Sequence, residues 1–295
     1  MSRAGVKPIE DRSLTGIALI LLAVTLFTGI DTCAKWLANS GMPQPVIVFV
    51  RFMVHFSFVL VLIGPLHGAD LFRSNNIRLE ILRALTLLIA TTANFIALRY
   101  LPLTVSSAII FAMPLILTAI SGPMLGEHVG WRRRIAVIVG FVGVLIIIRP
   151  LGGTVHWAAL LLLLTPLASA FYYVASRKLA GVDSPYTQQV YAALVPALCA
   201  MPLALLDWNW PTTGSAWFAF IAIGMFGGSG HLLLSMAHRF APASTLAPFM
   251  YPQIILMSIS SWLFFGQPPD LPVFLGSVLV VGSGIYIWIR ENRGT

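Results

Sequence analysis

Charged residues are scarce in this chain. Asp, Glu, Lys and Arg make up 9% of its 295 residues, whereas a soluble domain carries roughly 25% because its surface faces water. The mean hydropathy is correspondingly high, at +0.89. This shortage of charge excludes a soluble fold, and it predicts an all-α membrane protein.

Ten apolar runs separated by short polar gaps predict ten transmembrane helices. A helix needs about 20 apolar residues to cross the hydrocarbon layer, and the runs lack the alternation of apolar and polar residues that marks the strands of a membrane barrel. We expect the spans at residues 14–34, 46–64, 82–98, 103–124 and 135–148, then 157–175, 190–206, 217–237, 245–265 and 273–289.

Cysteine is also nearly absent. Cys33 and Cys199 lie in or beside apolar runs, so neither a disulfide framework nor a metal site is predicted, and no cofactor is expected. The formal charge of +8 does not indicate nucleic-acid binding, because the basic residues lie between apolar runs. The first run is long enough to span and lacks a clear cleavage site, so we expect a retained helix. The expected partners are the lipid bilayer and a small molecule.

The basic residues predict the orientation of the chain. One side of the membrane would hold only Lys35, Arg99 and Arg149. The other would hold Arg3, Lys7, Arg12, Arg73, Arg78, Arg132, Arg133, Arg134, Arg177, Lys178, Arg239, Arg290 and Arg293. Because positive charge concentrates in cytoplasmic loops, the tails at residues 1–13 and 290–295 are expected in the cytoplasm.

An internal repeat divides the chain into two halves. Residues 97–127 align without gaps on residues 237–267, and both copies contain the hairpin R-[YF]-x-P-x-[ST]. In this alignment Phe111 is matched by Tyr251. The halves are expected at residues 14–150 and 151–289. If each half has five helices, an odd number, the second must insert upside down relative to the first.

Several motifs occur in the order seen in a known family. The second run opens with Arg51-Phe52, and the fourth contains Pro114 and ends in Gly126-Glu127. A basic stretch and a glycine-bearing run follow, although Gln267 stands where the second half would have its glutamate. The chain resembles the EamA-type permeases of the drug/metabolite transporter superfamily. This resemblance implies an inner (plasma) membrane carrier with a central cavity between two halves, of a kind that commonly exports amino acids or related metabolites.

We therefore expect a secondary transporter, not an enzyme. Amino acids, including aromatic or other apolar ones, are the favoured cargo because aromatic residues are frequent near the middle of the spans. The alternatives are another metabolite or drug class, and facilitated diffusion or exchange in place of alternating access. A remote alternative is an intramembrane serine protease, suggested by Gly227-Gly228-Ser229-Gly230 before His231. A channel-like or purely structural membrane protein is the third class.

Asp31 is the carboxylate that lies most clearly inside an apolar run. Lys35 is one turn further along the same helix face, and Arg51 enters the second span from the same side, so we expect the three to form an ion-pair cluster. The cluster could be an outer gate or a dock for a substrate carboxylate. It could equally be a structural ion pair that neutralises buried charge.

Prolines within the runs predict interrupted helices, near which transport sites form. The substrate-binding residues expected there are Asn94, Ser107, Phe111, Tyr172, His231, Tyr251 and Gln253. Their aromatic faces and neutral hydrogen-bonding groups suit a small, partly apolar zwitterion or a neutral metabolite. The alternative for each is packing: lipid contact for the tyrosines, and interhelical hydrogen bonds for Asn94 and His231.

Overall fold

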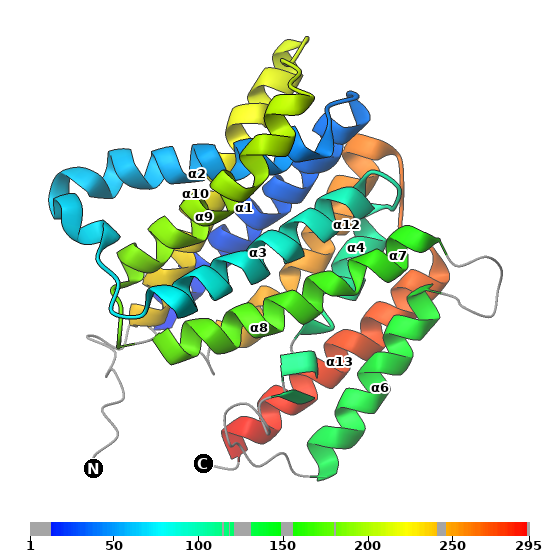
Figure 1. The fold of residues 1–295 in the computed structure, drawn as a ribbon. Helices are drawn as coiled ribbons and strands as arrows, with labels where there is room; N and C mark the ends of the chain where they lie inside the picture. Colours follow the sequence, from blue (N-terminus) through cyan, green and yellow to red (C-terminus); the bar gives the residue numbers. More distant parts are fainter. Residues whose placement is uncertain are drawn as a thin grey trace, which may run out of the picture.

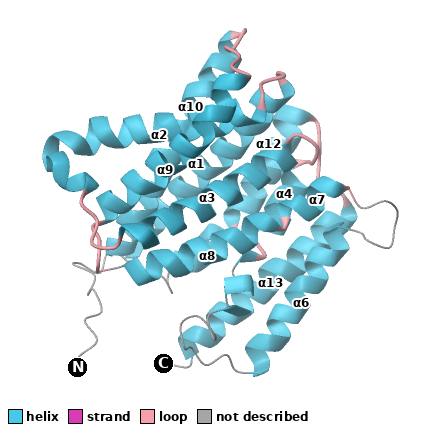
Figure 2. Cartoon of the chain, viewed as in Figure 1, coloured by secondary structure: helices cyan, strands magenta, loops and turns pink. Residues whose placement is uncertain are grey.

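The computed structural model describes residues 13–113, 115–117, 119–120, 131–148, 156–179, 181–240 and 246–293, and these contain helices and no β-strand (Figure 2). The first half holds α1 (Ser13–Asn39), α2 (Gln44–His67), the 3₁₀ helix η1 (Gly68–Phe72), α3 (Ile77–Leu98), α4 (Leu103–Ile110) and α6 (Trp131–Ile148). The second half holds α7 (Trp157–Leu162), α8 (Leu164–Leu179), α9 (Pro185–Leu206), α10 (Gly214–Phe240), the 3₁₀ helix η2 (Ala247–Met250), α12 (Pro252–Phe265) and α13 (Leu271–Arg293).

Seven helical segments of the described chain are long and apolar enough to cross a membrane. Three shorter apolar helices, Leu103–Leu117, Arg134–Ile148 and Pro252–Phe265, lie where the fourth, fifth and ninth spans are expected. The chain is therefore a multi-pass helical membrane protein, and the count of ten spans stays a prediction. Most of the expected N-terminal tail, Pro114 and Gly126-Glu127 lie outside the described residues, whereas residues 290–293 of the expected C-terminal tail form the end of α13.

Local sequence signals explain several helix ends. The Asn76 side chain accepts a hydrogen bond from the backbone N–H of Leu79 at 3.2 Å and caps the start of α3. Ser184 caps α9 in the same way, accepting from Thr187 at 3.0 Å, with Pro185 in the first turn, where its missing N–H costs nothing. Polar capping residues between apolar runs thus set where the spans begin.

Two apolar runs are broken partway along their length. The helix α4 ends at Ile110 and the chain turns at Phe111, and in the second half η2 leads through Tyr251 into α12. A third break, at Leu163, separates α7 from α8. The prediction of interrupted helices is confirmed at these places. It is wrong for the seventh run, because α9 continues through both of its internal prolines.

Helices from the two halves pack side by side in antiparallel pairs (Figure 1). In α6 and α13 the backbones nearly touch: a Cβ atom on Gly143 would lie 2.8 Å from the Gly276 carbonyl oxygen, and one on Gly276 would lie 2.6 Å from the Gly143 oxygen. Trp131, which begins α6, lines the same groove as Tyr286 near the end of α13. The neighbours α2 and α9, α1 and α10, and α3 and α8 complete the bundle.

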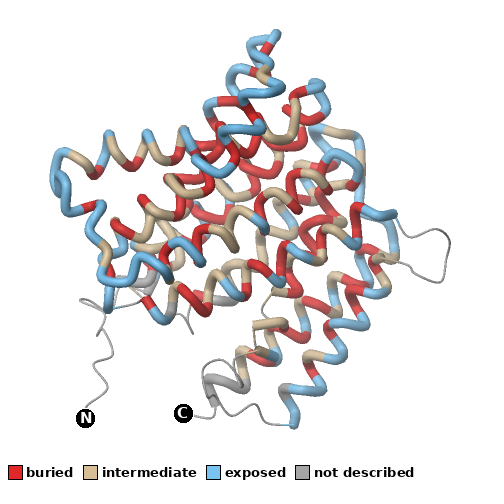
Figure 3. Tube along the Cα trace, viewed as in Figure 1, coloured by how far each residue is buried: buried red, intermediate tan, exposed pale blue. Residues whose placement is uncertain are grey.

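The buried residues lie where the helices of the bundle pack together. Buried segments lie on the helix faces that meet, and exposed segments lie on the outward faces (Figure 3). The buried core includes Phe52, Phe95 and Leu98, each at most 2% exposed. Large apolar side chains on the outside, such as Val61 at 78% exposed, are what a surface in contact with lipid requires.

Candidate functional site

A chain of hydrogen bonds joins three helices inside the bundle. The Asn94 amide of α3 donates to Oδ1 of Asp31 in α1 at 2.8 Å, and the Ser106 hydroxyl of α4 donates to Oδ1 of Asn94, also at 2.8 Å. All three side chains are buried. Because an unpaired polar group is costly in hydrocarbon, these bonds hold α1, α3 and α4 together. Asn94 thus has protein partners on two helices.

Lys35 does not pair with Asp31, so the expected ion pair is wrong. The Lys35 ammonium donates to the carbonyl oxygens of Leu98 and Leu101 at 3.1 and 2.5 Å, and it lies 5.4 Å from the centre of the Phe265 ring. The Leu98 carbonyl is at the C-terminal end of α3, where the helix dipole favours a cation. Spacing along α1 could not show that α3 ends beside it.

Arg51 brings a buried positive charge to the same region. Its side chain is 4% exposed, its guanidinium lies 4.3 Å from the centre of the Phe52 ring, and it acts electrostatically on Asp31. Within the described chain, no carboxylate lies within 4.0 Å of it as an ion-pair partner. Its Nε and Nη1 atoms are buried without a hydrogen-bond partner. Of the expected cluster, Asp31 and Arg51 are brought together and Lys35 is not.

Two histidine rings stack deeper in the bundle. His55 follows Arg51 by one turn of α2, and its ring lies parallel to that of His231 in α10, with centres 5.9 Å apart and planes within 5°. Phe27 of α1 contacts the His231 ring at 5.1 Å. His55 is completely buried, and neither of its ring nitrogens has a hydrogen-bond partner among the described residues, although Gln189 lies nearby.

Glycines of α10 allow this approach. A Cβ atom on Gly228 would lie 2.6 Å from the Phe58 ring, and one on Gly230 would lie 2.6 Å from the Phe27 ring. Any larger residue would push α10 away from α1 and α2. The glycine run that suggested a protease motif therefore serves helix packing. Among the described residues Ser229 makes no hydrogen bond to a histidine; the serine that bonds His231 is Ser235, through the His231 backbone carbonyl oxygen.

A buried ion pair in α3 escaped the sequence analysis. Arg83 donates from Nε and Nη2 to Oε2 of Glu80 at 3.1 and 2.9 Å, and Glu80 is completely buried. Arg83 also donates to the Tyr172 hydroxyl of α8 at 3.0 Å and to the Gln188 carbonyl oxygen of α9. The available signal was the spacing of opposite charges three residues apart, which is more typical of an exposed helix end.

Loops from the two halves are latched together at this end of the bundle. The carboxylate of Asp183, between α8 and α9, accepts from the Ser74 hydroxyl at 2.5 Å and from the Asn75 backbone N–H at 2.7 Å. The Asn75 amide also donates to the Val182 carbonyl oxygen at 2.7 Å. Burial opposes ionisation of Asp183, but these hydrogen bonds outweigh it and hold the pKa of the carboxyl below its usual value.

The two helix breaks in the middle of the fourth and ninth runs face each other. Phe111 follows the last residue of α4 and Tyr251 precedes the first residue of α12. Their ring centres are 5.6 Å apart. The residues that the repeat alignment makes equivalent are therefore in contact, at positions where the backbone leaves the helix.

The other predicted substrate residues are placed differently. Ser107 is completely buried and donates to the Thr104 carbonyl oxygen at 2.9 Å, so its neighbour Ser106 is the serine that joins the polar chain. Tyr172 is half-buried and bonded to Arg83. Gln253 is half-buried and makes no hydrogen bond among the described residues. Neither Ser107 nor Gln253 belongs to the clusters around Asp31 and His55.

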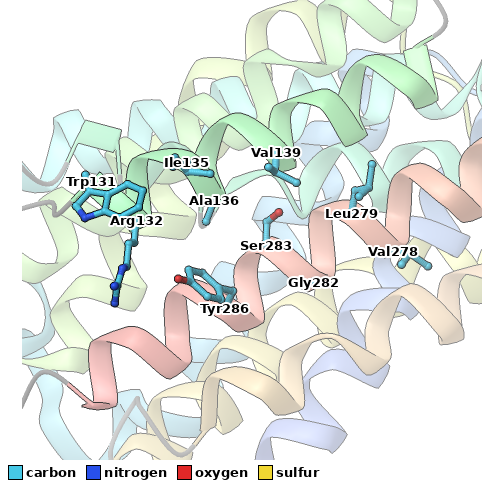
Figure 4. Close-up of a pocket in the computed structure, with 10 residues that line it drawn as sticks. All are labelled: Trp131, Arg132, Ile135, Ala136, Val139, Val278, Leu279, Gly282, Ser283 and Tyr286. Atoms are coloured by element: carbon cyan, nitrogen blue, oxygen red, sulfur yellow. The ribbon is translucent and has the colours of Figure 1, made fainter.

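A groove of about 460 Å³ runs between α6 and α13, away from these clusters (Figure 4). Its walls are mainly apolar, with Trp131, Arg132 and Tyr286 toward one end. None of the buried charged groups described above lines it. The buried charged groups, and not this groove, are the candidate functional site.

Helices of span length, broken helices beside them and charged groups enclosed between them define a class, the polytopic membrane transporter. The model of the EamA-like transporter family matches residues 14–149 and again residues 156–289. The chain belongs to this family, and it is therefore a membrane transporter for small molecules.

Similar proteins are named for different cargoes. The chain is 28% identical to a riboflavin transporter of Vibrio cholerae over 97% of its length and 96% of the relative's. It is 24% identical to an S-adenosylmethionine uptake transporter of Rickettsia prowazekii, over 95% and 94% of the two chains. It is 26% identical to the pseudopaline exporter CntI of Pseudomonas aeruginosa, over 97% and 100%. A crystal structure with a TM-score of 0.66 and 18% identity, covering 95% of this chain and 97% of that one, shares the fold.

Proposed function

We propose that this chain is a secondary transporter that exports small metabolites, with amino acids as the first class to test, across the bacterial inner membrane. The observation that carries the proposal is a set of charged and polar side chains between helices of both halves. Asp31, Arg51 and His55 from the first half are buried, and the half-buried His231 from the second half stacks on His55. Charged groups are expensive within a membrane and mark solute pathways.

The packing supports ten spans arranged as two inverted repeats. Helices α6 and α13 begin 140 residues apart, at Trp131 and Leu271, which is the offset of the sequence repeat. Under that offset α2 corresponds to α9, and each packs against its own equivalent, as α6 does against α13. The pair α1 with α10 corresponds to the pair α8 with α3. A twofold relation between residues 14–150 and 151–289 accounts for all four contacts.

The antiparallel directions favour an inverted relation. Equivalent helices that cross the membrane in opposite senses are what a twofold axis in the membrane plane produces. The latch of Ser74, Asn75 and Asp183 joins the two halves at one end of the bundle, so opening it would be one step of alternating access. With both tails in the cytoplasm, that latch lies on the cytoplasmic side.

Transport is tested in liposomes that contain the purified protein. We expect saturable uptake and counterflow of at least one radiolabelled amino acid, and loss of the flux on His231→Ala. Ser229→Ala is the matched control in the same helix and should retain flux without any peptide cleavage. Flux that never saturates and shows no counterflow would instead indicate a channel. No flux of any amino acid would overturn this cargo class, and riboflavin and S-adenosylmethionine would be tested next.

Orientation is tested with single cysteines in exposed loops, after replacement of Cys33 and Cys199. An impermeant thiol reagent added to intact spheroplasts should label Ser40→Cys and Thr212→Cys but not Asp70→Cys. Labelling of all three, or of Asp70→Cys alone, would contradict the proposed topology.

A further inference from the structure

Arg51 has more hydrogen-bonding capacity than the protein uses. Its guanidinium is buried, and neither Nε nor Nη1 has a hydrogen-bond partner among the described residues. The buried arginine of α3, Arg83, shows the contrast, because it donates to Glu80, to the Tyr172 hydroxyl and to the Gln188 carbonyl oxygen. A guanidinium with two unpaired nitrogens in a low-dielectric interior is costly, and a carboxylate is the group that its planar fork fits best.

Asp31 is likewise only partly used. Its Oδ1 atom accepts the Asn94 amide, whereas Oδ2 accepts no hydrogen bond from a described residue. Asn94 is itself held by Ser106, which fixes the orientation of the carboxylate. Asp31 therefore offers one free acceptor on a rigid support, while Arg51 offers free donors on the neighbouring helix.

Asp31 and Arg51 carry opposite charges, yet no contact within 4.0 Å joins them in the described chain. Two opposite charges on adjacent helices that are not paired with each other can each pair with the complementary charge of a ligand. The head group of an α-amino acid has this pattern, a carboxylate and an ammonium on one carbon atom. Lys35, the third cation of the expected cluster, is occupied by the carbonyls of Leu98 and Leu101 and does not compete.

We propose that Asp31 and Arg51 read the zwitterionic head group of the cargo, with Arg51 donating to its carboxylate and Asp31 accepting from its ammonium. The proposal rests on the proposed transport function and assigns its specificity to two residues. The parallel rings of His55 and His231 lie one turn of α2 deeper than Arg51, where the side chain of an amino acid bound in this way would extend.

The test compares an amino acid with derivatives that each remove one charge. Binding of L-phenylalanine, L-tryptophan, L-leucine and L-lysine to the purified protein is measured by thermal stabilisation, beside their amides and N-acetyl forms. We expect at least one of the four to bind and its amide and N-acetyl derivatives to bind about tenfold more weakly or worse, since each lacks one charge-assisted contact. Equal binding of parent and derivatives, or no binding by any of the four, would overturn the proposal.

Variants assign the two contacts. Arg51→Gln should remove the preference for the free acid over the amide, and Asp31→Asn should remove the preference for the free amine over the N-acetyl form. The matched controls Arg132→Gln and Asp70→Asn, both at exposed positions, should leave both preferences intact. Retention of both preferences by Arg51→Gln and Asp31→Asn would refute the assignment even if transport is normal. Selective binding without flux would refute the transport function and leave the assignment standing.

Discussion

Replacing Arg83 with Gln should destabilise the protein severely. Arg83 is the partner of Glu80, whose side chain is completely buried, and it also holds Tyr172 and Gln188, so one substitution strands a buried carboxylate and unties α3 from α8 and α9. Interhelical hydrogen bonds in membranes average only about 0.6 kcal/mol, whereas removing one member of a buried ion pair costs about 3–5 kcal/mol. The stranded charge therefore dominates, and a loss of about 3 kcal/mol or more is expected.

The assay is reversible unfolding in mixed micelles by increasing SDS, followed by circular dichroism. Glu80→Gln combined with Arg83→Met removes both charges and should be less destabilised than Arg83→Gln alone, because no uncompensated charge remains. Arg73→Gln is the control, since the ion pair of Arg73 with Asp70 is exposed and worth about 1 kcal/mol or less. A loss below about 1 kcal/mol for Arg83→Gln, or a double variant worse than Arg83→Gln, would refute the reasoning.

Three further outcomes are expected in the same unfolding assay or in its pH dependence. Gly224→Ala should lower the free energy of unfolding by about 1–3 kcal/mol, because the new Cβ atom would lie 2.3 Å from the Cβ atom of Val54. Gly282→Ala meets nothing within 4 Å and should not lower it. Equal effects of the two variants would contradict this packing. Lys35→Met should cost about 1.5–3 kcal/mol through the loss of charged hydrogen bonds to the end of α3, and a neutral result would contradict that capping role. Because the pKa of Asp183 is lowered in the folded protein, its contribution to stability is complete above about pH 4 and is lost as the pH falls through the folded pKa. Asp183→Asn should therefore reduce the loss of stability in acid. An unchanged pH profile would show that the hydrogen bonds of Asp183 do not cause that loss.

Much of the fold was accessible from composition and local pattern. The described helices lie over the expected apolar runs, and the capping residues Asn76 and Ser184 mark helix starts that any reader of the sequence could propose. The repeat alignment pairs Phe111 with Tyr251, and their rings are in contact. Polar contacts were less accessible, because they depend on which helices become neighbours. Lys35 capping α3 and Arg83 tying three helices together are of this kind.

The prolines also show which features local sequence predicts and which depend on neighbouring helices. Proline removes a backbone donor wherever it lies, and the sequence alone therefore marks each proline within a run as a place where the span is weakened. Breaks occur around residues 111, 163 and 251, whereas α9 stays continuous through Pro196 and Pro202. Neighbouring helices decide whether the freed backbone groups are satisfied in a bent helix or in an open turn.

The membrane location and the helical structure could be read from the sequence alone, because the cost of burying charge and the length of a span act on each segment separately. The sequence also predicts that the two halves are related. Which buried charged groups find partners depends on how the helices pack. Arg83, Lys35 and one oxygen of Glu80 are bonded to neighbouring groups, whereas Nε and Nη1 of Arg51 and one oxygen of Asp31 have no partner among the described residues. Glu80 finds Arg83 within its own helix, but the partners of Lys35 come from a part of the chain far away in sequence, so only the packing of the helices brings them together.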